Sequence, residues 1–299
     1  MARILGIDVS HHQAELDWHN VAGGGVGFCF IRATEGTASV DGCFELNWQR
    51  SQDVGLYRGA SHFARVGADA ATQAVHFHSV VGSPGFLDLP PVLDIEEANG
   101  HSPEEVLRWT REFLLKAAEL FDREPILYTG HFWREYLKDP VDEFFGKHPL
   151  WLAGYVPEER LKIPAAWRRW SFWQYTDGTH TPPRPILGVP ACAQNLFAGN
   201  LSDLSALCST ISAPRPPLPA LLPGDLWPGV HLVWRRSPAM TGDVVRRFQQ
   251  RMFQLGFEID PDGAYGPQSK RVCQAFQKER GLAADGIVGQ KTWLAAFGA

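Results

Sequence analysis

Eight short apolar or β-rich runs recur along the first two thirds of the chain, and their spacing constrains the fold more than any other feature. The runs are 4–10, 28–36, 57–64, 90–97, 125–130, 150–155, 171–176 and 193–198. Helix-like stretches separate the earlier runs, which is typical of βαβ units and a mainly parallel sheet. The sequence therefore predicts an α/β fold with a barrel related to the TIM type. The last gaps are too short for helices, so the final strands are expected to be antiparallel.

The clearest of the separating stretches is residues 102–121, SPEEVLRWTREFLLKAAELF. Ser102 is a good N-cap, and Pro103 suits the first helical position because no amide hydrogen is needed there. One face of the expected helix is apolar and is formed by Val106, Trp109, Phe113 and Ala117. The pattern predicts an amphipathic helix between the fourth and fifth runs.

A proline-rich segment divides the chain. Residues 212–223 hold five prolines in twelve positions, and proline both removes amide donors and favours extended backbone, so a semi-rigid linker is expected. From Gly224 onward 10 basic and 7 acidic residues give a net charge of +3, whereas the rest of the chain carries −8. We therefore expect a large domain over 1–211, a linker over 212–223 and a small domain over 224–299.

The small domain contains a short repeat. DGAYG at 262–266 returns as DGIVG at 285–289, and each copy has the residues typical of a turn that leads into a helix. Two helix-like stretches carry apolar stripes, formed by Val245, Phe248, Met252 and Leu255 and by Val272, Ala275 and Phe276. These features predict a compact all-α domain.

Composition and charge argue against several classes of protein. The net charge of −5 does not suggest a nucleic-acid partner. No apolar run approaches the ~18 residues of a membrane span, and the N-terminus lacks the features of a signal peptide, so synthesis in the cytosol without stable membrane association is expected. Five cysteines without a CxxC argue against a disulfide scaffold or a zinc site. His11 and His12 have no third ligand at a recognisable spacing, so no metal or other cofactor is expected.

Three carboxylates are expected to meet at one end of the barrel. Asp94 and Glu96 end the fourth run, and side chains two positions apart on a strand point to the same face. Asp8 ends the first run in the corresponding place, and the carboxyl ends of barrel strands form one mouth. Repulsion and partial burial should raise the pKa of at least one of these groups, which gives the protonated and ionised pair that glycosidic cleavage needs. The alternative is a solvated acidic loop that forms salt bridges with arginine.

Seven motifs occur together in the large domain in a fixed order. They are GIDVSHHQ near the start, RATEG at 32–36, SHF at 61–63, LDIE at 93–96, YTG at 128–130, WLAGY at 151–155 and WQYT at 173–176. In order and spacing they resemble the glycoside hydrolase family 25 muramidases. The resemblance implies a (β/α)5β3 barrel that cleaves the β-1,4 bond between N-acetylmuramic acid and N-acetylglucosamine in peptidoglycan. It also implies that Glu96 is the general acid, that Asp94 assists at the anomeric centre, and that Asp8 holds substrate or tunes the charge.

A carboxyl pair separated by one residue is too close to hold a water across the sugar ring, so a retaining route is expected. Either Asp94 or the substrate's own N-acetyl group would attack the anomeric carbon. The resemblance is incomplete, because Ala193 stands where the family usually carries an aspartate and Ser61 where a tyrosine is frequent. Asp177 is a candidate to replace the missing carboxylate. A catalytically weak or inactive wall-binding protein on the same barrel is the alternative function.

The motifs also supply candidate substrate-binding residues, and all of them except Gln174 have a structural alternative. They are His62, Tyr128, Tyr155, Trp151, Gln174 and Glu35. His62 faces the cleft or is a satisfied core histidine, and the two tyrosines bind sugar or pack at the rim with bonded hydroxyls. Trp151 lines the cleft or belongs to the core, and Glu35 joins the charge network or pairs with an arginine.

The small domain resembles a second family. GDVVRRFQQRMFQLGF, DGAYGPQSKRVCQAFQKERGL and DGIVGQKTW, at about 240–297, are similar to the peptidoglycan-binding domain type 1, a three-helix unit. The resemblance implies bacterial peptidoglycan as the partner, and tethering to it would raise the local enzyme concentration at the wall. The two resemblances together suggest a monomeric endolysin of phage or prophage origin that acts on the wall after release from the cytoplasm.

Overall fold

The computed structural model describes residues 3–13, 16–85, 88–179, 183–208 and 240–297. The chain divides into two compact units. The first holds Met1–Gln52 and Leu56–Ser212, and the second holds Asp53–Gly55 and Ala213–Ala299. The predicted linker at 212–223 lies outside the described residues.

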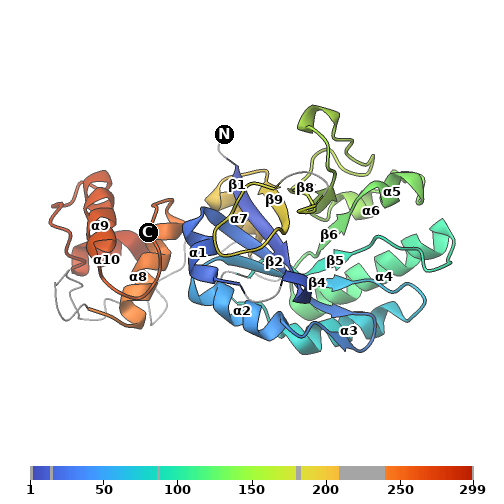
Figure 1. The fold of residues 1–299 in the computed structure, drawn as a ribbon, viewed down its shortest axis with the longest axis horizontal. Helices are drawn as coiled ribbons and strands as arrows, with labels where there is room; N and C mark the ends of the chain where they lie inside the picture. The colour runs from blue at the N-terminus through green and yellow to red at the C-terminus, as the bar shows by residue number, and fades with distance from the viewer. Residues whose placement is uncertain (1–2, 14–15, 86–87, 180–182, 209–239, 298–299) are drawn as a thin grey trace. The chain divides into compact units, whose positions relative to one another are not determined.

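Eight strands of the first unit close into a barrel (Figure 1). They are β1 (Ile4–Val9), β2 (Val26–Glu35), β4 (Tyr57–Phe63), β5 (Val92–Asp94), β6 (Ile126–Thr129), β7 (Leu150–Ala153), β8 (Phe172–Thr176) and β9 (Ala193–Phe197). Their order is β1-β9-β8-β7-β6-β5-β4-β2, and the pairing of β1 with β2 completes the ring. The short strand β3 (Ser39–Val40) pairs only with β2 among the described strands. Each of the eight predicted runs coincides with one barrel strand, so the prediction of an α/β barrel is confirmed.

Strand direction differs in part from the prediction. All neighbouring pairs from β1 through β2, β4, β5, β6 and β7 to β8 are parallel. Within the barrel, β9 is antiparallel to both of its neighbours, β8 and β1. The prediction of antiparallel final strands is therefore right for β9 and wrong for β8. The connection over 154–171 is long enough to return the chain for a parallel pair even though its only regular element is the single turn η2 (Glu158–Arg160).

The described helices of the first unit lie between barrel strands along the chain, except α7, which follows β9. They are α1 (Trp18–Gly23), α2 (Phe44–Asp53), α3 (Ala70–Val81), α4 (Pro103–Phe121), α5 (His131–Glu135), α6 (Glu143–Gly146) and α7 (Leu201–Leu207), with a 3-10 turn η1 (His11–Gln13) after β1. Figure 1 shows α2, α3 and α4 along the outside of the strands. Helix α4 begins as predicted, because the Ser102 hydroxyl accepts from the Glu105 amide and the Glu105 carboxylate accepts from the Ser102 amide. Its predicted apolar face is buried.

Phenylalanine rings fill the barrel interior. Phe28, Phe30 and Phe172 contact one another with ring centroids 5.0–5.6 Å apart. Two glycines make room for them, since a Cβ at Gly6 would lie 2.3 Å from the Phe28 ring and a Cβ at Gly59 would lie 2.5 Å from the Phe30 ring. The closed interior leaves substrate access to the ends of the strands.

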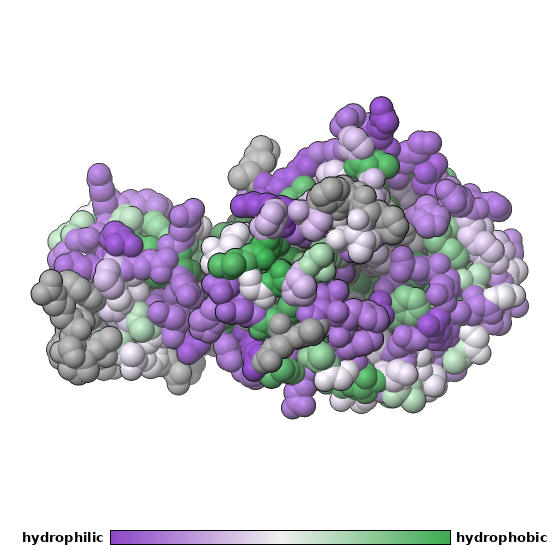
Figure 2. Space-filling view, viewed as in Figure 1, coloured by the Kyte–Doolittle hydropathy of each residue, from purple (hydrophilic) through white to green (hydrophobic). Residues whose placement is uncertain are grey.

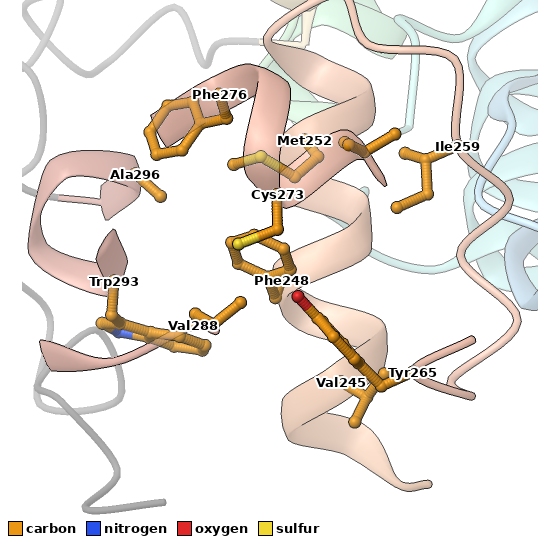
Figure 3. Packing of buried hydrophobic residues seen from close by; sticks show 11 residues of the cluster. Val245, Phe248, Met252, Ile259, Tyr265, Cys273, Phe276, Val288, Trp293 and Ala296 are labelled. Carbon is orange, nitrogen blue, oxygen red and sulfur yellow. The ribbon is translucent and has the colours of Figure 1, made fainter. Parts of the chain in front are cut away.

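The second unit has a hydrophobic core between three described helices, α8 (Asp243–Gln254), α9 (Pro267–Glu279) and α10 (Gln290–Phe297). Figure 3 shows Phe248, Met252, Phe276 and Trp293 converging on this core. The predicted stripe on α8 is buried at Val245, Phe248 and Met252, with Leu255 packed partly buried against it. On α9 the prediction for Ala275 is wrong, because Ala275 is exposed while Cys273 is fully buried. The helical turn places position 273, between Val272 and Phe276, toward the partner helices.

Two buried glutamines explain the DGxxG repeat. The Gln249 side-chain amide donates to Asp262 and to the Ala264 carbonyl, and its Oε1 accepts from the Gly263 amide at 2.8 Å. Gln277 makes the matching set of bonds with Asp285, Ile287 and Gly286. The aspartate and the first glycine of each copy are therefore held by one glutamine from a preceding helix.

The face of the barrel seen in Figure 2 is largely hydrophilic, with hydrophobic residues in smaller groups between. Among the described helices, none has both the length and the apolar character that crossing a bilayer requires.

Candidate active site

A pocket of about 260 Å³ opens among the carboxyl-terminal parts of the barrel strands. Four acidic residues line it: Asp8, Asp94, Glu96 and Asp177. Four aromatic residues line it as well: Phe30, Tyr128, Trp151 and Tyr155. The three carboxylates expected to converge therefore do so, in a cavity that also offers aromatic surface.

Asp8 is held in place by two side-chain amides. Its Oδ2 accepts from Gln174 Nε2 at 3.0 Å and from Asn195 Nδ2 at 2.8 Å. The register of the sheet explains this, because Asp8 on β1 pairs with Ala193 on β9, and Asn195 follows two positions along the same face. Burial raises the pKa of Asp8, while the two amide bonds act in the opposite direction. Asp8 is thus an oriented acceptor rather than a mobile side chain.

Asp94 is buried at the end of β5. Its Oδ1 has no hydrogen-bond partner in the described part of the chain, and its Oδ2 lies 3.9 Å from Arg32 Nη2. Burial raises the pKa of Asp94 well above its ordinary value, and the neighbouring charge of Glu96 raises it further. Arg32 only partly opposes this effect.

Glu96 lies beyond the last residue of β5, so strand alternation is not what aims it. The expectation that both carboxylates extend from one strand is wrong on this point, yet Glu96 lines the same pocket as Asp94. The intervening backbone is fixed because the Ile95 amide donates to the Tyr128 carbonyl. Glu96 is exposed, yet partial desolvation in the pocket raises its pKa and Asp8 adds to the rise, whereas Arg32 lowers it.

Asp94 and Glu96 titrate as a pair whose two charges repel each other in a partly desolvated pocket. A proton is therefore retained on the pair at a pH where an isolated aspartate and glutamate would both be ionised. A carboxylic acid whose pKa is raised and that lies beside further carboxylates is chemically suited to protonate a leaving oxygen.

A relay of hydrogen bonds connects the aromatic wall to Asp8. The hydroxyls of Tyr128 and Tyr155 donate to Gln174 Oε1 at 3.0 and 2.7 Å, and Gln174 in turn donates to Asp8. Trp151 donates to Asn195 Oδ1 at 2.8 Å and stacks on Phe30 with centroids 4.1 Å apart. The four predicted residues of this wall, Tyr128, Tyr155, Trp151 and Gln174, all line the pocket. Tyr155 is the most open of them, with 38% of its surface exposed.

His62 does not reach the pocket, so its prediction as a substrate-binding residue is not supported by its position. It is fully buried on the outer side of β4, stacked on Phe113 with centroids 5.0 Å apart. Its ring nitrogens are bonded to Thr34 Oγ1 and Gln73 Oε1. Its neighbour Ser61 lines the pocket instead, as the alternation of strand side chains requires. His62 is therefore a core histidine with both ring nitrogens hydrogen-bonded, which was the alternative that the sequence left open.

Glu35 pairs with an arginine, which was one of its two expected settings. Its Oε1 accepts from Arg65 Nη2 at 2.6 Å, and Arg65 also pairs with Glu97. Glu35 lines a second pocket of about 390 Å³ rather than the acidic one, and Arg32 lines both. Glu35 therefore faces the second pocket and is not among the residues that line the acidic pocket.

Two residues of the site were not singled out from the sequence. Arg32 is the cation beside Asp94, and it lies in the RATEG motif. Asn195 orients both Asp8 and Trp151, and it follows Ala193 on β9. Arg32 lies in a quoted motif and Asn195 in the last of the eight runs, so the available signal was an arginine or amide on the inward face of a strand next to a candidate carboxylate.

No group of three or more His, Cys, Asp or Glu side chains is arranged to hold a metal ion within the described ranges. His11, which the sequence raised as a weak metal candidate, bonds through Nδ1 to Asp41 at 2.7 Å.

A closed α/β barrel with a cluster of carboxylates at its mouth is an arrangement that suits a glycoside hydrolase. The sequence matches the family described as glycosyl hydrolases family 25 over residues 7–183, and the chain belongs to that family. Residues 241–295 match a second family, described as a peptidoglycan binding domain.

The chain is similar to several known proteins and solved structures. Uncharacterized protein YegX of Escherichia coli K12 is 37% identical over 215 residues, which are 70% of this chain and 74% of YegX. Lysozyme M1 of Streptomyces globisporus is 34% identical over 182 residues, 58% of this chain and 62% of that protein. The solved structure of a muramidase from Acremonium alcalophilum is 30% identical with a TM-score of 0.62, covering 69% of this chain and 99% of that one.

Proposed function

We propose that the chain is an N-acetylmuramidase that hydrolyses the β-1,4 bond between N-acetylmuramic acid and N-acetylglucosamine in peptidoglycan. The observation that carries the proposal is the gathering of Asp8, Asp94 and Glu96 in one pocket, where the pKa of each carboxyl is raised. The family match, the lysozyme and muramidase relatives and the peptidoglycan-binding match all support peptidoglycan as the substrate.

Glu96 would act as the general acid, because its side chain is exposed in the open pocket, whereas Asp94 is buried, and because its pKa is raised. It would protonate the oxygen of the glycosidic bond as that bond breaks. Asp94, 3.9 Å from Arg32, would assist the anomeric centre, either by attacking it directly or by supporting attack by the substrate's N-acetyl oxygen. Either route retains the anomeric configuration. Asp8, held by two amides, would accept a hydrogen bond from the sugar or tune the charge of the pair.

The second unit would bind the wall and so raise the concentration of the barrel at an insoluble substrate. We propose the boundaries 1–211, 212–223 and 224–299 for the barrel, the linker and the binding domain. The finer architecture would be a (β/α)5β3 barrel, supported by the antiparallel β9, followed by an all-α domain, supported by α8, α9 and α10.

The protein would act as a monomer on the cell wall without stable membrane association. We propose that it is made in the cytoplasm and released for lysis, as a phage or prophage lysin would be.

The test combines wall lysis with product analysis. Purified cell walls lose turbidity on addition of the wild-type chain, and mass spectrometry of the products finds reducing-end N-acetylmuramic acid. Glu96→Gln keeps the shape of the side chain but cannot supply the proton, so activity falls by about 100-fold or more. Fragments ending in N-acetylglucosamine would contradict the proposed bond.

A second candidate function is a wall-binding protein with little or no activity. Ala193 favours it, since this residue lines the pocket where the family usually carries an aspartate. Tight binding to walls without any lysis, equal in wild type and Glu96→Gln, would establish it.

A further inference from the structure

The acidic pocket contains a fourth carboxylate, Asp177, to which the proposed mechanism gives no role. It follows β8, on the other side of β9 from Asp8. The register explains its position. Asp8 on β1 pairs with Ala193 on β9, and Thr176 on β8 pairs with Gln194, so the next residue, Asp177, comes opposite Ala193.

A bulge in β8 aims Asp177 into the pocket. The register with β9 shifts between Gln174 and Thr176, so Tyr175 is an extra residue in β8. In a regular strand, side chains three apart point to opposite faces, yet Gln174 and Asp177 both line the pocket. The extra residue reverses the alternation after Gln174 and turns Asp177 inward.

The side chain of Asp177 is also oriented and electrostatically connected to the site. Its Oδ1 accepts from the Thr179 amide at 2.8 Å, which fixes one oxygen of the carboxylate. Tyr155, the most open aromatic of the wall, has its pKa raised first by burial and then by the charges of Asp8 and Asp177. Between the two aspartates, position 193 contributes only a methyl group.

We propose that Asp177 is a further substrate-binding residue of this chain, whose carboxylate accepts a hydrogen bond from an N–H or O–H donor of the sugar beside Tyr155. A carboxylate can only accept, and N-acetylated sugars present both acetamido N–H and hydroxyl donors in reach of such a group. The small side chain of Ala193 leaves the space that the sugar needs between Asp8 and Asp177. The inference rests on the proposed glycan substrate.

Glycan affinity tests the inference separately from turnover. Calorimetry with peptide-free wall oligosaccharides is performed on full-length Glu96→Gln, alone and combined with Asp177→Asn. The asparagine keeps an oxygen for the Thr179 amide but loses the charge, so Kd should rise by about 10- to 100-fold while the melting temperature stays unchanged. Glu119→Gln, an acid-to-amide change on an exposed part of α4, is the control and should leave Kd as it was.

A rescue variant separates binding from a structural role. Adding Ala193→Asp to the Asp177→Asn background places a carboxylate on β9, directly opposite position 177. This addition should lower Kd at least tenfold relative to Asp177→Asn. An unchanged Kd for Asp177→Asn, or a loss that accompanies a lower melting temperature and is not recovered by Ala193→Asp, would overturn the inference. Failure of the wild type to lyse walls, with oligosaccharide binding intact, would instead refute the proposed activity alone.

Discussion

Substitution of the buried His62 gives a direct measure of its role in the barrel. Burial lowers its pKa from 6.5 to about 4, although the hydrogen bond with Gln73 opposes that effect. Below pH 6.5 the unfolded chain binds a proton at this position and the folded chain does not, so stability is lost as the pH falls from 6.5 to about 4. Since one pKa unit corresponds to about 1.4 kcal/mol, the full effect amounts to about 3 kcal/mol.

His62→Gln removes the titrating group while leaving a polar side chain between Thr34 and Gln73. The variant will be less stable near neutral pH, because it loses the packing of the ring on Phe113. The informative quantity is the difference in unfolding free energy between wild type and variant, which should shrink by about 3 kcal/mol between pH 7 and pH 4. His148, whose pKa is also lowered to about 4, contributes equally to both proteins and cancels in this difference.

Urea unfolding followed by tryptophan fluorescence at a series of pH values supplies the measurement, with the transition of the barrel analysed separately from that of the second unit. Wall lysis at pH 7 is measured alongside, and its KM should match that of the wild type because His62 does not line the pocket. A pH-independent difference in stability would refute the reasoning. A raised KM with unchanged stability would place the imidazole in the substrate cleft.

Three further predictions follow from the same structure. Asp94→Asn lowers lytic activity by about 100-fold or more. It nevertheless stabilises the fold above pH ~4, because the raised pKa of Asp94 costs the wild type stability once the unfolded chain ionises. The gain in melting temperature should grow with pH and vanish in acid, and a lower melting temperature at pH 7 would contradict the prediction. Gln277→Ala removes the side-chain bonds to Asp285 and Ile287 and leaves the Gly286 amide without its partner, so it should destabilise the second unit by about 2–3 kcal/mol in calorimetry, with Gln249→Ala as the matched variant. Deletion of 212–299 should leave a folded barrel active on short soluble glycans with weaker wall binding in a pull-down assay, and loss of all activity would show that the units depend on each other.

The sequence determined the elements of this protein because their signals are local. Periodic apolar runs predicted all eight barrel strands, and the Ser102 cap predicted the start of α4. The sequence also predicted that Asp8 and Asp94 converge, because the carboxyl ends of barrel strands lie at one end of the barrel. Predictions that used only strand ends and helix caps therefore held.

Tertiary packing decided which face each neighbouring side chain presents. Strand alternation directs Ser61 to the pocket and His62 to the helices. The sequence SHF alone does not show which of these two residues faces the pocket. The inward aim of Asp177 depends on one extra residue in β8, which is visible only when β8 is paired with β9. The direction of β8, the exposure of Ala275 and the two amides that hold Asp8 depend likewise on partners distant in the chain. Local propensity specifies where a strand or helix forms, whereas the register of a strand and the facing of its residues are set by contacts that exist only in the closed barrel.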